Sequence, residues 1–221
     1  MLEDGGETGQ LVMSAPEAKI QRFPVWKWLL ALAVCALLAA LAFHYVDLPL
    51  AKAVAGWMGS TKGLATGFAS NILLGIEGTI ALTLALLRIT RGRLSPLGEA
   101  TGLACLTSIC AYAVNDHALK PFFGVPDPVA VWLGTPHAFH LFGGSAGGSF
   151  PSGHMVIAGA FAGVFMRLYR RTVGMFSALL LIAAVLLVVG EWHFVSDVIA
   201  GTFVGVGAGI LAGELWLAHA N

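Results

Sequence analysis

Residues 150–154 combine proline, serine, glycine and histidine in an order that suits anion binding. The segment reads Phe-Pro-Ser-Gly-His and follows a glycine-rich stretch. Pro151 suits the first turn of a helix, where its missing N–H group costs nothing. The free N–H groups of that turn would hold an anion, with Ser152 adding a hydroxyl and Gly153 allowing a close backbone approach. His154 would then stand beside the bound group, unless the segment is only a flexible loop that leads into a helix with an interfacial histidine.

A second segment, residues 190–197, carries a histidine and a carboxylate at helical spacing. It reads Gly-Glu-Trp-His-Phe-Val-Ser-Asp. His193 and Asp197 are four residues apart, so on a helical turn they share a face. A carboxylate on one imidazole nitrogen fixes the tautomer and raises the basicity of the other nitrogen, which is what a nucleophilic histidine requires. The structural alternative is a capping aspartate beside an interfacial histidine.

Lys120 is the single basic residue within residues 116–151. A lysine just outside an apolar segment can clamp a phosphate, and the alternative is a side chain that only reaches toward the membrane interface. His137 and His140 lie farther along the same connection, in a stretch rich in proline and glycine. We expect these two histidines to be solvated, and the sequence contains no convincing metal cluster.

The chain that carries these segments is too apolar for an ordinary soluble domain. Of its 221 residues, 57% are hydrophobic and only 11% are charged. The sequence predicts six segments of membrane-crossing length. They cover residues 25–43, 64–87, 97–114, 152–168, 173–189 and 198–216. The expected fold is an all-α bundle of six transmembrane helices over residues 25–218, preceded by a disordered cytoplasmic tail, residues 1–24.

The basic residues predict how these helices are oriented. With both termini in the cytoplasm, nine lysines and arginines fall on the cytoplasmic side and only three on the other. Such an excess on one side is the positive-inside rule. All three segments described above then lie on the extracytoplasmic face, and the expected location is a bacterial inner membrane.

Other features bear on the partners of the protein. The net charge is zero and no basic block is present, so nucleic acid is not an expected partner. The last apolar segment has a glycine at every fourth position, which predicts close packing within the bundle or, alternatively, a homodimer through this helix. The four glycines are Gly201, Gly205, Gly209 and Gly213. Glu77 lies in the middle of the second apolar segment and is expected to pair inside the bundle.

In this order and on one face, the three segments resemble the motifs of the type 2 phosphatidic acid phosphatase superfamily. That pattern is Lys-x6-Arg-Pro, then Pro-Ser-Gly-His, then Ser-Arg-x5-His-x3-Asp, on a six-helix membrane core. The resemblance implies that His193 attacks phosphorus and becomes a phosphohistidine, oriented by Asp197, while His154 protonates the leaving oxygen. It also implies that no metal or other cofactor is needed. The implied phosphate-binding residues are Lys120, Ser152 and Gly153.

Both arginines of the family pattern are missing. The first would fall at Asp127, although Pro128 follows as the pattern requires, and the Ser-Arg pair would fall at Leu186 and Leu187. Arginine matches phosphate oxygens with two parallel hydrogen bonds, so the loss of both clamps should cost several kcal/mol of transition-state stabilisation.

Three hypotheses follow from this departure. The first is a lipid phosphatase acting on a lipid phosphate monoester or diphosphate in the membrane. The second is a head-group phosphotransferase similar to sphingomyelin and inositol phosphorylceramide synthases, whose phosphodiester donor carries less charge. In that case Asp127 and Glu191, with the neighbouring Trp192, would face the head group. The third is an inactive lipid-binding protein, against which the retained His154 and His193 argue.

Overall fold

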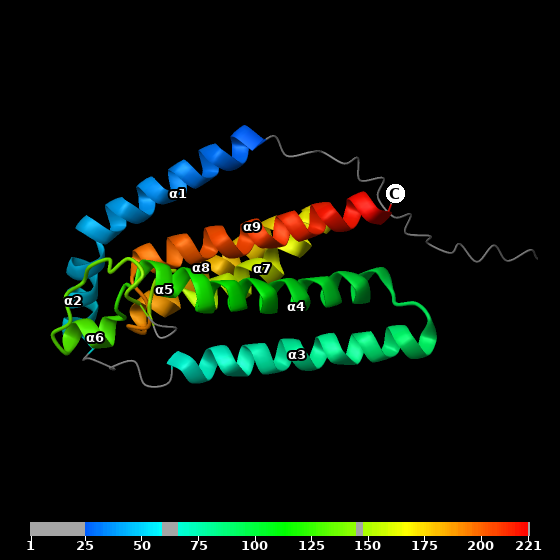
Figure 1. Ribbon diagram of the computed structural model, residues 1–221, viewed down its shortest axis with the longest axis horizontal. Coiled ribbons are helices and arrows are strands. Elements are labelled where there is room, and N and C mark those ends of the chain that lie inside the picture. Colours follow the sequence, from blue (N-terminus) through cyan, green and yellow to red (C-terminus); the bar gives the residue numbers. More distant parts are fainter. Residues whose placement is uncertain (1–24, 59–65, 145–147, 221) are drawn as a thin grey trace, which may run out of the picture.

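The computed structural model describes residues 25–58, 66–144 and 148–220. Within these ranges the chain is all helical, as predicted, and contains no strand. The predicted tail, residues 1–24, lies outside them. The long helices run side by side along one axis, and the short ones gather at one end of the bundle (Figure 1). The helices are α1 (Val25–Tyr45), α2 (Asp47–Met58), α3 (Thr66–Arg91), α4 (Pro96–Val114), α5 (Lys120–Phe123), α6 (Pro128–Trp132), α7 (Gly153–Leu168), α8 (Val173–Val189) and α9 (Val195–Ala220).

Five helical segments of the described chain are long and apolar enough to cross a membrane. They are Val25–Tyr45, Ser70–Arg91, Pro96–Trp132, Arg170–Val189 and Val195–His219. The remaining predicted segment, residues 152–168, corresponds to α7, which is apolar but has only 16 residues. At 1.5 Å per residue it extends about 24 Å, less than the roughly 30 Å of a bilayer's hydrocarbon core.

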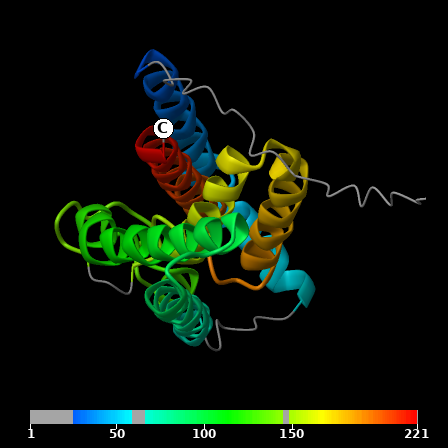
Figure 2. The same cartoon turned by 90° about the vertical axis from the view of Figure 1, so that its right-hand side faces the viewer.

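α7 can be short because it is surrounded by other helices rather than by lipid. It packs most extensively against α9, with α4, α8 and part of α3 also in contact (Figure 2). Its buried residues include Met155, Val156 and Ile157 in the first turns and Val164 near the end. α7 is therefore the central helix, and its first turn is held from several sides at once.

The glycines of α9 make the close contact with α7. A Cβ atom on Gly201 would lie 2.5 Å from the Ser152 carbonyl oxygen, and one on Gly205 would lie 2.6 Å from that of Val156. Gly209 faces the Ala160 carbonyl in the same way, and Gly213 faces Arg167. The predicted packing within the bundle is thus confirmed. This face of α9 is occupied inside the chain, so a homodimer would have to use another face, and the homodimer stays a prediction.

The α3–α4 pair forms a hairpin that closes at the end opposite the short helices. Gly92 turns the chain with a φ of 73°, and Ser95 caps α4 by accepting a hydrogen bond from the Gly98 N–H at 3.1 Å. Between the two helices the Ser108 hydroxyl donates a hydrogen bond to the Glu77 carboxylate. The predicted pairing of Glu77 inside the bundle is confirmed.

α4 does not stop where the apolar stretch ends. It continues through a single π-helical turn, Asn115–Leu119, in which the Lys120 N–H donates to the Asn115 carbonyl, and then into α5. α5 ends at Gly124, whose φ of 60° lies in the left-handed region that glycine adopts most readily. The π-helical turn places Asn115 and Lys120 at the same end of the bundle as the start of α7.

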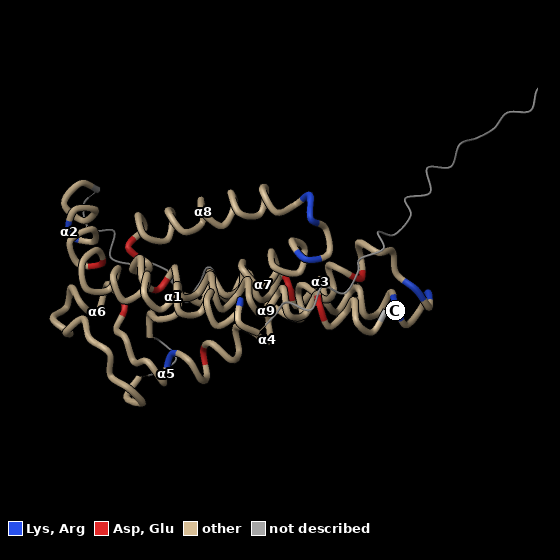
Figure 3. The backbone as a smooth tube through the Cα atoms, turned by 90° about the horizontal axis from the view of Figure 1, so that it is seen from above, with Lys and Arg blue, Asp and Glu red and all other residues tan. Residues whose placement is uncertain are grey.

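Arginines gather at the opposite end of the bundle (Figure 3). Arg88 and Arg91 lie in the last turn of α3, and Arg167 lies in the last turn of α7. Arg167 donates two hydrogen bonds to Glu214 of α9, at 2.6 and 2.9 Å. The two ends of the molecule therefore differ in kind: one carries arginines, and the other carries the histidines described next.

Candidate active site

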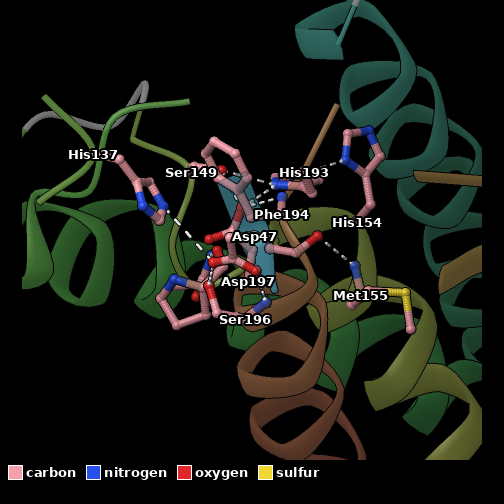
Figure 4. A network of polar contacts seen from close by, with 12 residues as sticks. Asp47, His137, Ser149, His154, Met155, His193, Phe194, Ser196 and Asp197 are labelled. Atoms are coloured by element: carbon pink, nitrogen blue, oxygen red, sulfur yellow. Dashed lines mark hydrogen bonds and ion pairs between the residues drawn. The ribbon is translucent and has the colours of Figure 1, made fainter. Parts of the chain in front are cut away.

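His193 and Asp197 face each other at the start of α9, as their spacing predicts. His193 lies in the turn between α8 and α9, and its Nδ1 is 3.4 Å from the Asp197 Oδ2 (Figure 4). The same Oδ2 accepts a hydrogen bond from the Phe194 N–H at 2.8 Å. Asp197 is completely buried, so its carboxylate cannot turn toward solvent. With Nδ1 facing a carboxylate, the lone pair of a neutral His193 lies on Nε2.

Ser149 is a third member of this group that sequence reasoning missed. Its hydroxyl donates to the Asp197 Oδ2 and lies 3.3 Å from the His193 Nδ1. The residue sits in the glycine-rich stretch, where its only signal is its position just before the Phe-Pro-Ser-Gly-His segment. Ser149 therefore contacts both members of the pair, through the same carboxylate oxygen that faces His193.

His154 lies on the open nitrogen of His193. The distance from its Nδ1 to the His193 Nε2 is 3.3 Å, and its own Nε2 is 3.0 Å from the Ser70 hydroxyl on α3. Ser70 was not predicted, because a single serine in an apolar helix carries no signal. The His193 Nε2 is therefore covered by His154, and a third group could reach it only if this contact opened.

The predicted phosphate-binding residues also meet at the first turn of α7. The Lys120 Nζ lies 3.7 Å from where a Cβ of Gly153 would be, and that Cβ would lie only 2.8 Å from the Tyr112 ring. Glycine is thus needed here for α4 and α7 to approach. Lys120 also forms an ion pair with Asp116 at 2.9 Å. The Ser152 hydroxyl is buried and accepts from the Met155 N–H at 3.4 Å.

Of the three residues predicted near the substrate, Trp192 contacts one of the two histidines, His154. Its ring centroid lies 5.6 Å from that of His154. Glu191 precedes it in the turn, buried and with a left-handed φ of 56°. Asp127 caps α6 by accepting from the Ala130 N–H at 2.7 Å. Its proximity to substrate stays a prediction.

His137 corrects the expectation of two solvated histidines. His140 is exposed, but the side chain of His137 is only 3% exposed. Its ring stacks on Phe43 at 4.1 Å and lies 4.4 Å from the ring of Phe194. Burial lowers the pKa of His137. Proline and glycine in the sequence indicated a loop, but they did not reveal that this loop folds back onto α1.

Asp47 lies beside His137 and was also missed. It is the first residue of α2, and its Oδ2 is 3.7 Å from the His137 Nε2. The Ser196 N–H and hydroxyl both donate to it, at 3.0 and 2.5 Å. Burial raises the pKa of the Asp47 carboxyl above its usual range.

The site combines a buried carboxylate, two histidines in contact and a lysine at a helix start. Within the described ranges no three histidine, cysteine or acidic side chains are grouped so that they could hold a metal ion. Such an arrangement can perform nucleophilic and acid–base chemistry on an anionic ester.

Comparison with known families places this site inside a recognised domain. The family model described as PAP2 superfamily matches residues 101–218, more than half of the chain. Comparisons with curated proteins and with solved structures gave no significant match. The matched range holds Lys120, His154, His193 and Asp197, and it confirms the resemblance on which their roles were predicted. The chain therefore belongs to the PAP2 superfamily, the type 2 phosphatidic acid phosphatases.

Proposed function

We propose that this integral membrane protein is a lipid phosphatase that hydrolyses a lipid phosphate monoester or diphosphate through a phosphohistidine. Members of the family are generally phosphatases or phosphotransferases that act on lipid phosphates. The observation that carries the proposal is the direction of the His193 ring, with Nδ1 on Asp197 and Nε2 toward His154. That arrangement leaves the attacking nitrogen next to a proton donor.

In the first step, the His193 Nε2 attacks phosphorus and forms a P–N bond. The bond between phosphorus and the leaving oxygen breaks, and protonated His154 gives that oxygen its proton. Asp197 stabilises the positive charge that the His193 ring acquires, and Ser149 holds the carboxylate in place. Lys120 and the first turn of α7 bind the phosphoryl oxygens.

In the second step, His154 acts as the base. It takes a proton from water, the water oxygen attacks phosphorus, and the P–N bond breaks. Inorganic phosphate leaves, and both histidines return to their starting states. Because Ser70 bonds the far nitrogen of His154 at 3.0 Å, it holds the ring while the proton moves.

A head-group phosphotransferase is the second candidate, and a specific observation favours it. The positions of the two family arginines offer no cation: the Asp127 carboxylate caps α6, and Leu187 is buried with Met155 and Val198. The charge of Lys120 is shared with Asp116. A phosphodiester donor carries one negative charge and needs less compensation than a phosphate monoester.

The two candidates differ in where the phosphoryl group goes. Purified protein is incubated with phosphatidate and, separately, with a labelled phospholipid plus diacylglycerol or ceramide. Release of inorganic phosphate from phosphatidate, unchanged by a chelator, supports the phosphatase. Label on the acceptor lipid supports the transferase. If neither product forms, both candidates are contradicted.

The proposed topology has six spans with α7 as the fourth, both termini in the cytoplasm, and the site on the extracytoplasmic face of a bacterial inner membrane. The arginines at one end of the bundle support it through the positive-inside rule. In a variant without native cysteines, we expect a cysteine at Phe142, which is 81% exposed, to react with an impermeant maleimide added to intact cells. A cysteine at the exposed Arg170 should react only after the cells are opened. The reverse pattern would place the site on the cytoplasmic face.

A further inference from the structure

We propose that Asp47 is a positioning residue that fixes the first turn of α9 and with it the Asp197–His193 pair. The inference rests on the proposed role of His193 as the nucleophile. Asp47 lies outside residues 101–218, the range that the family model matches. It would give the α1–α2 segment a part in catalysis.

The contacts of Asp47 are those of a helix cap supplied by another helix. Its Oδ1 accepts from the Ser196 N–H at 3.0 Å, and its Oδ2 accepts from the Ser196 hydroxyl at 2.5 Å. Ser196 stands in the first turn of α9, where backbone N–H groups have no partner within the helix and a negative charge is favourable. The residue after Ser196 is Asp197, so the cap acts one residue from the carboxylate that orients His193.

A second hydrogen bond ties this backbone to a neighbouring helix. The Asp197 carbonyl oxygen accepts a hydrogen bond from the Ser152 N–H at 3.0 Å, which ties α9 to the start of α7. The first turn of α9 is therefore held by two contacts, one from Asp47 to Ser196 and one from Ser152 to Asp197. If Asp47 is removed, the first turn of α9 can loosen, and the 3.4 Å contact between Asp197 and His193 is no longer maintained.

The surroundings of Asp47 suit this role. Asp47 is 1% exposed, and its pKa is raised by burial and, more weakly, by the charge of Asp197. A neutral cap such as serine could also hold a helix start, and it would avoid placing a second carboxyl near that of Asp197. His137 closes the other side of Asp47, wedged between Phe43 and Phe194. In Figure 4 a dashed line joins His137, at the left, to Asp47, which lies near Asp197 at the centre of the group.

The test compares Asp47→Ala with Asp47→Asn, because asparagine keeps one acceptor oxygen for the Ser196 N–H. We expect kcat on the lipid phosphate to fall at least tenfold in Asp47→Ala and less in Asp47→Asn, with KM within twofold in both. The matched control is Ser95→Ala, which removes the cap of α4 at the far end of the bundle and should leave kcat unchanged. An unchanged kcat in a folded Asp47→Ala would overturn the proposal.

A double-mutant cycle with Ser196→Ala tests whether Asp47 acts through that residue. The losses in kcat should be less than additive, since both changes remove the hydrogen bond between the Ser196 hydroxyl and Asp47. Fully additive losses would contradict a positioning role exerted through this hydroxyl. If Asp47→Ala does not fold, the cycle is run with Asp47→Asn.

Side-chain ¹⁵N resonances of His193 keep this inference separate from the proposed function. The wild-type ring should be a single tautomer protonated on Nδ1, and Asp47→Ala should show a mixture of tautomers. This readout needs no substrate. A wild-type protein that turns over no lipid phosphate would defeat the proposed function alone, whereas an unchanged tautomer in a folded Asp47→Ala would defeat the positioning role.

Discussion

Replacing His193 with alanine is expected to abolish the release of phosphate from a lipid phosphate, with a loss on the order of 10⁴-fold or more. Among the described residues His137 also faces a buried carboxylate, that of Asp47, but its ring is packed between Phe43 and Phe194 and away from His154. Asp197→Asn should leave slight activity, because the ring remains in place but its favoured tautomer changes. The measurement is inorganic phosphate released by purified protein in detergent micelles.

His140→Ala is the matched control, since His140 is an exposed histidine at the same end of the bundle. It should retain the wild-type rate. Rapid acid-free quenching with a ³²P-labelled substrate should also trap an acid-labile phosphoenzyme in the wild type and none in His193→Ala. Full activity in His193→Ala would end the phosphohistidine mechanism.

Replacing Gly209 with leucine is expected to separate α9 from α7 and to cost at least about 3 kcal/mol of stability. A side chain at this position would meet the Ala160 carbonyl and the Gly163 backbone, neither of which can move without shifting a whole helix. The effect should appear as a large fall in the apparent melting temperature in detergent, with helix content nearly unchanged.

The control for this change is Gly78→Ala in α3, where a Cβ meets nothing within 4 Å. Alanine is a better helix former than glycine by roughly 1 kcal/mol, so this variant should melt at or slightly above the wild-type temperature. A Gly209→Leu variant as stable as Gly78→Ala would show that α7 and α9 do not approach as closely as described.

Local spacing was enough to predict that His193 and Asp197 form a pair in the site. The i, i+4 relation of His193 and Asp197 brings them together in any helical turn, and the predicted helix limits agree with the structure to within a few residues. Such periodicity describes only neighbours along one helix. Ser70 reaches His154 across 84 residues, and Asp47 reaches Ser196 across 149. These contacts depend on how helices pack and slide against each other, which the residue pattern of one helix does not contain.

The missing arginines illustrate the same limit. The motif spacing places one arginine position at Leu187, and its backbone carbonyl does accept hydrogen bonds from the Trp192 and His193 N–H groups. The Leu187 side chain, however, points into an apolar cluster with Met155 and Val198. An arginine introduced there would bury an unpaired charge. The sequence showed that the clamp is absent, and the structure adds that an arginine at position 187 would not restore it.

The π-helical turn at Asn115–Leu119 makes the site sensitive to chain length as well as to residue type. Each residue of an α-helix advances the side chains by roughly 100°. Deleting one residue from this turn would restore regular α-helical bonding, and every later side chain of the continuous helix would rotate by about that angle. Lys120 would turn away from Gly153, although no residue of the phosphate-binding set had been changed. In this fold, the insertion or deletion of one residue in this turn is therefore a route by which related chains could bring a lysine side chain into the site or turn it away.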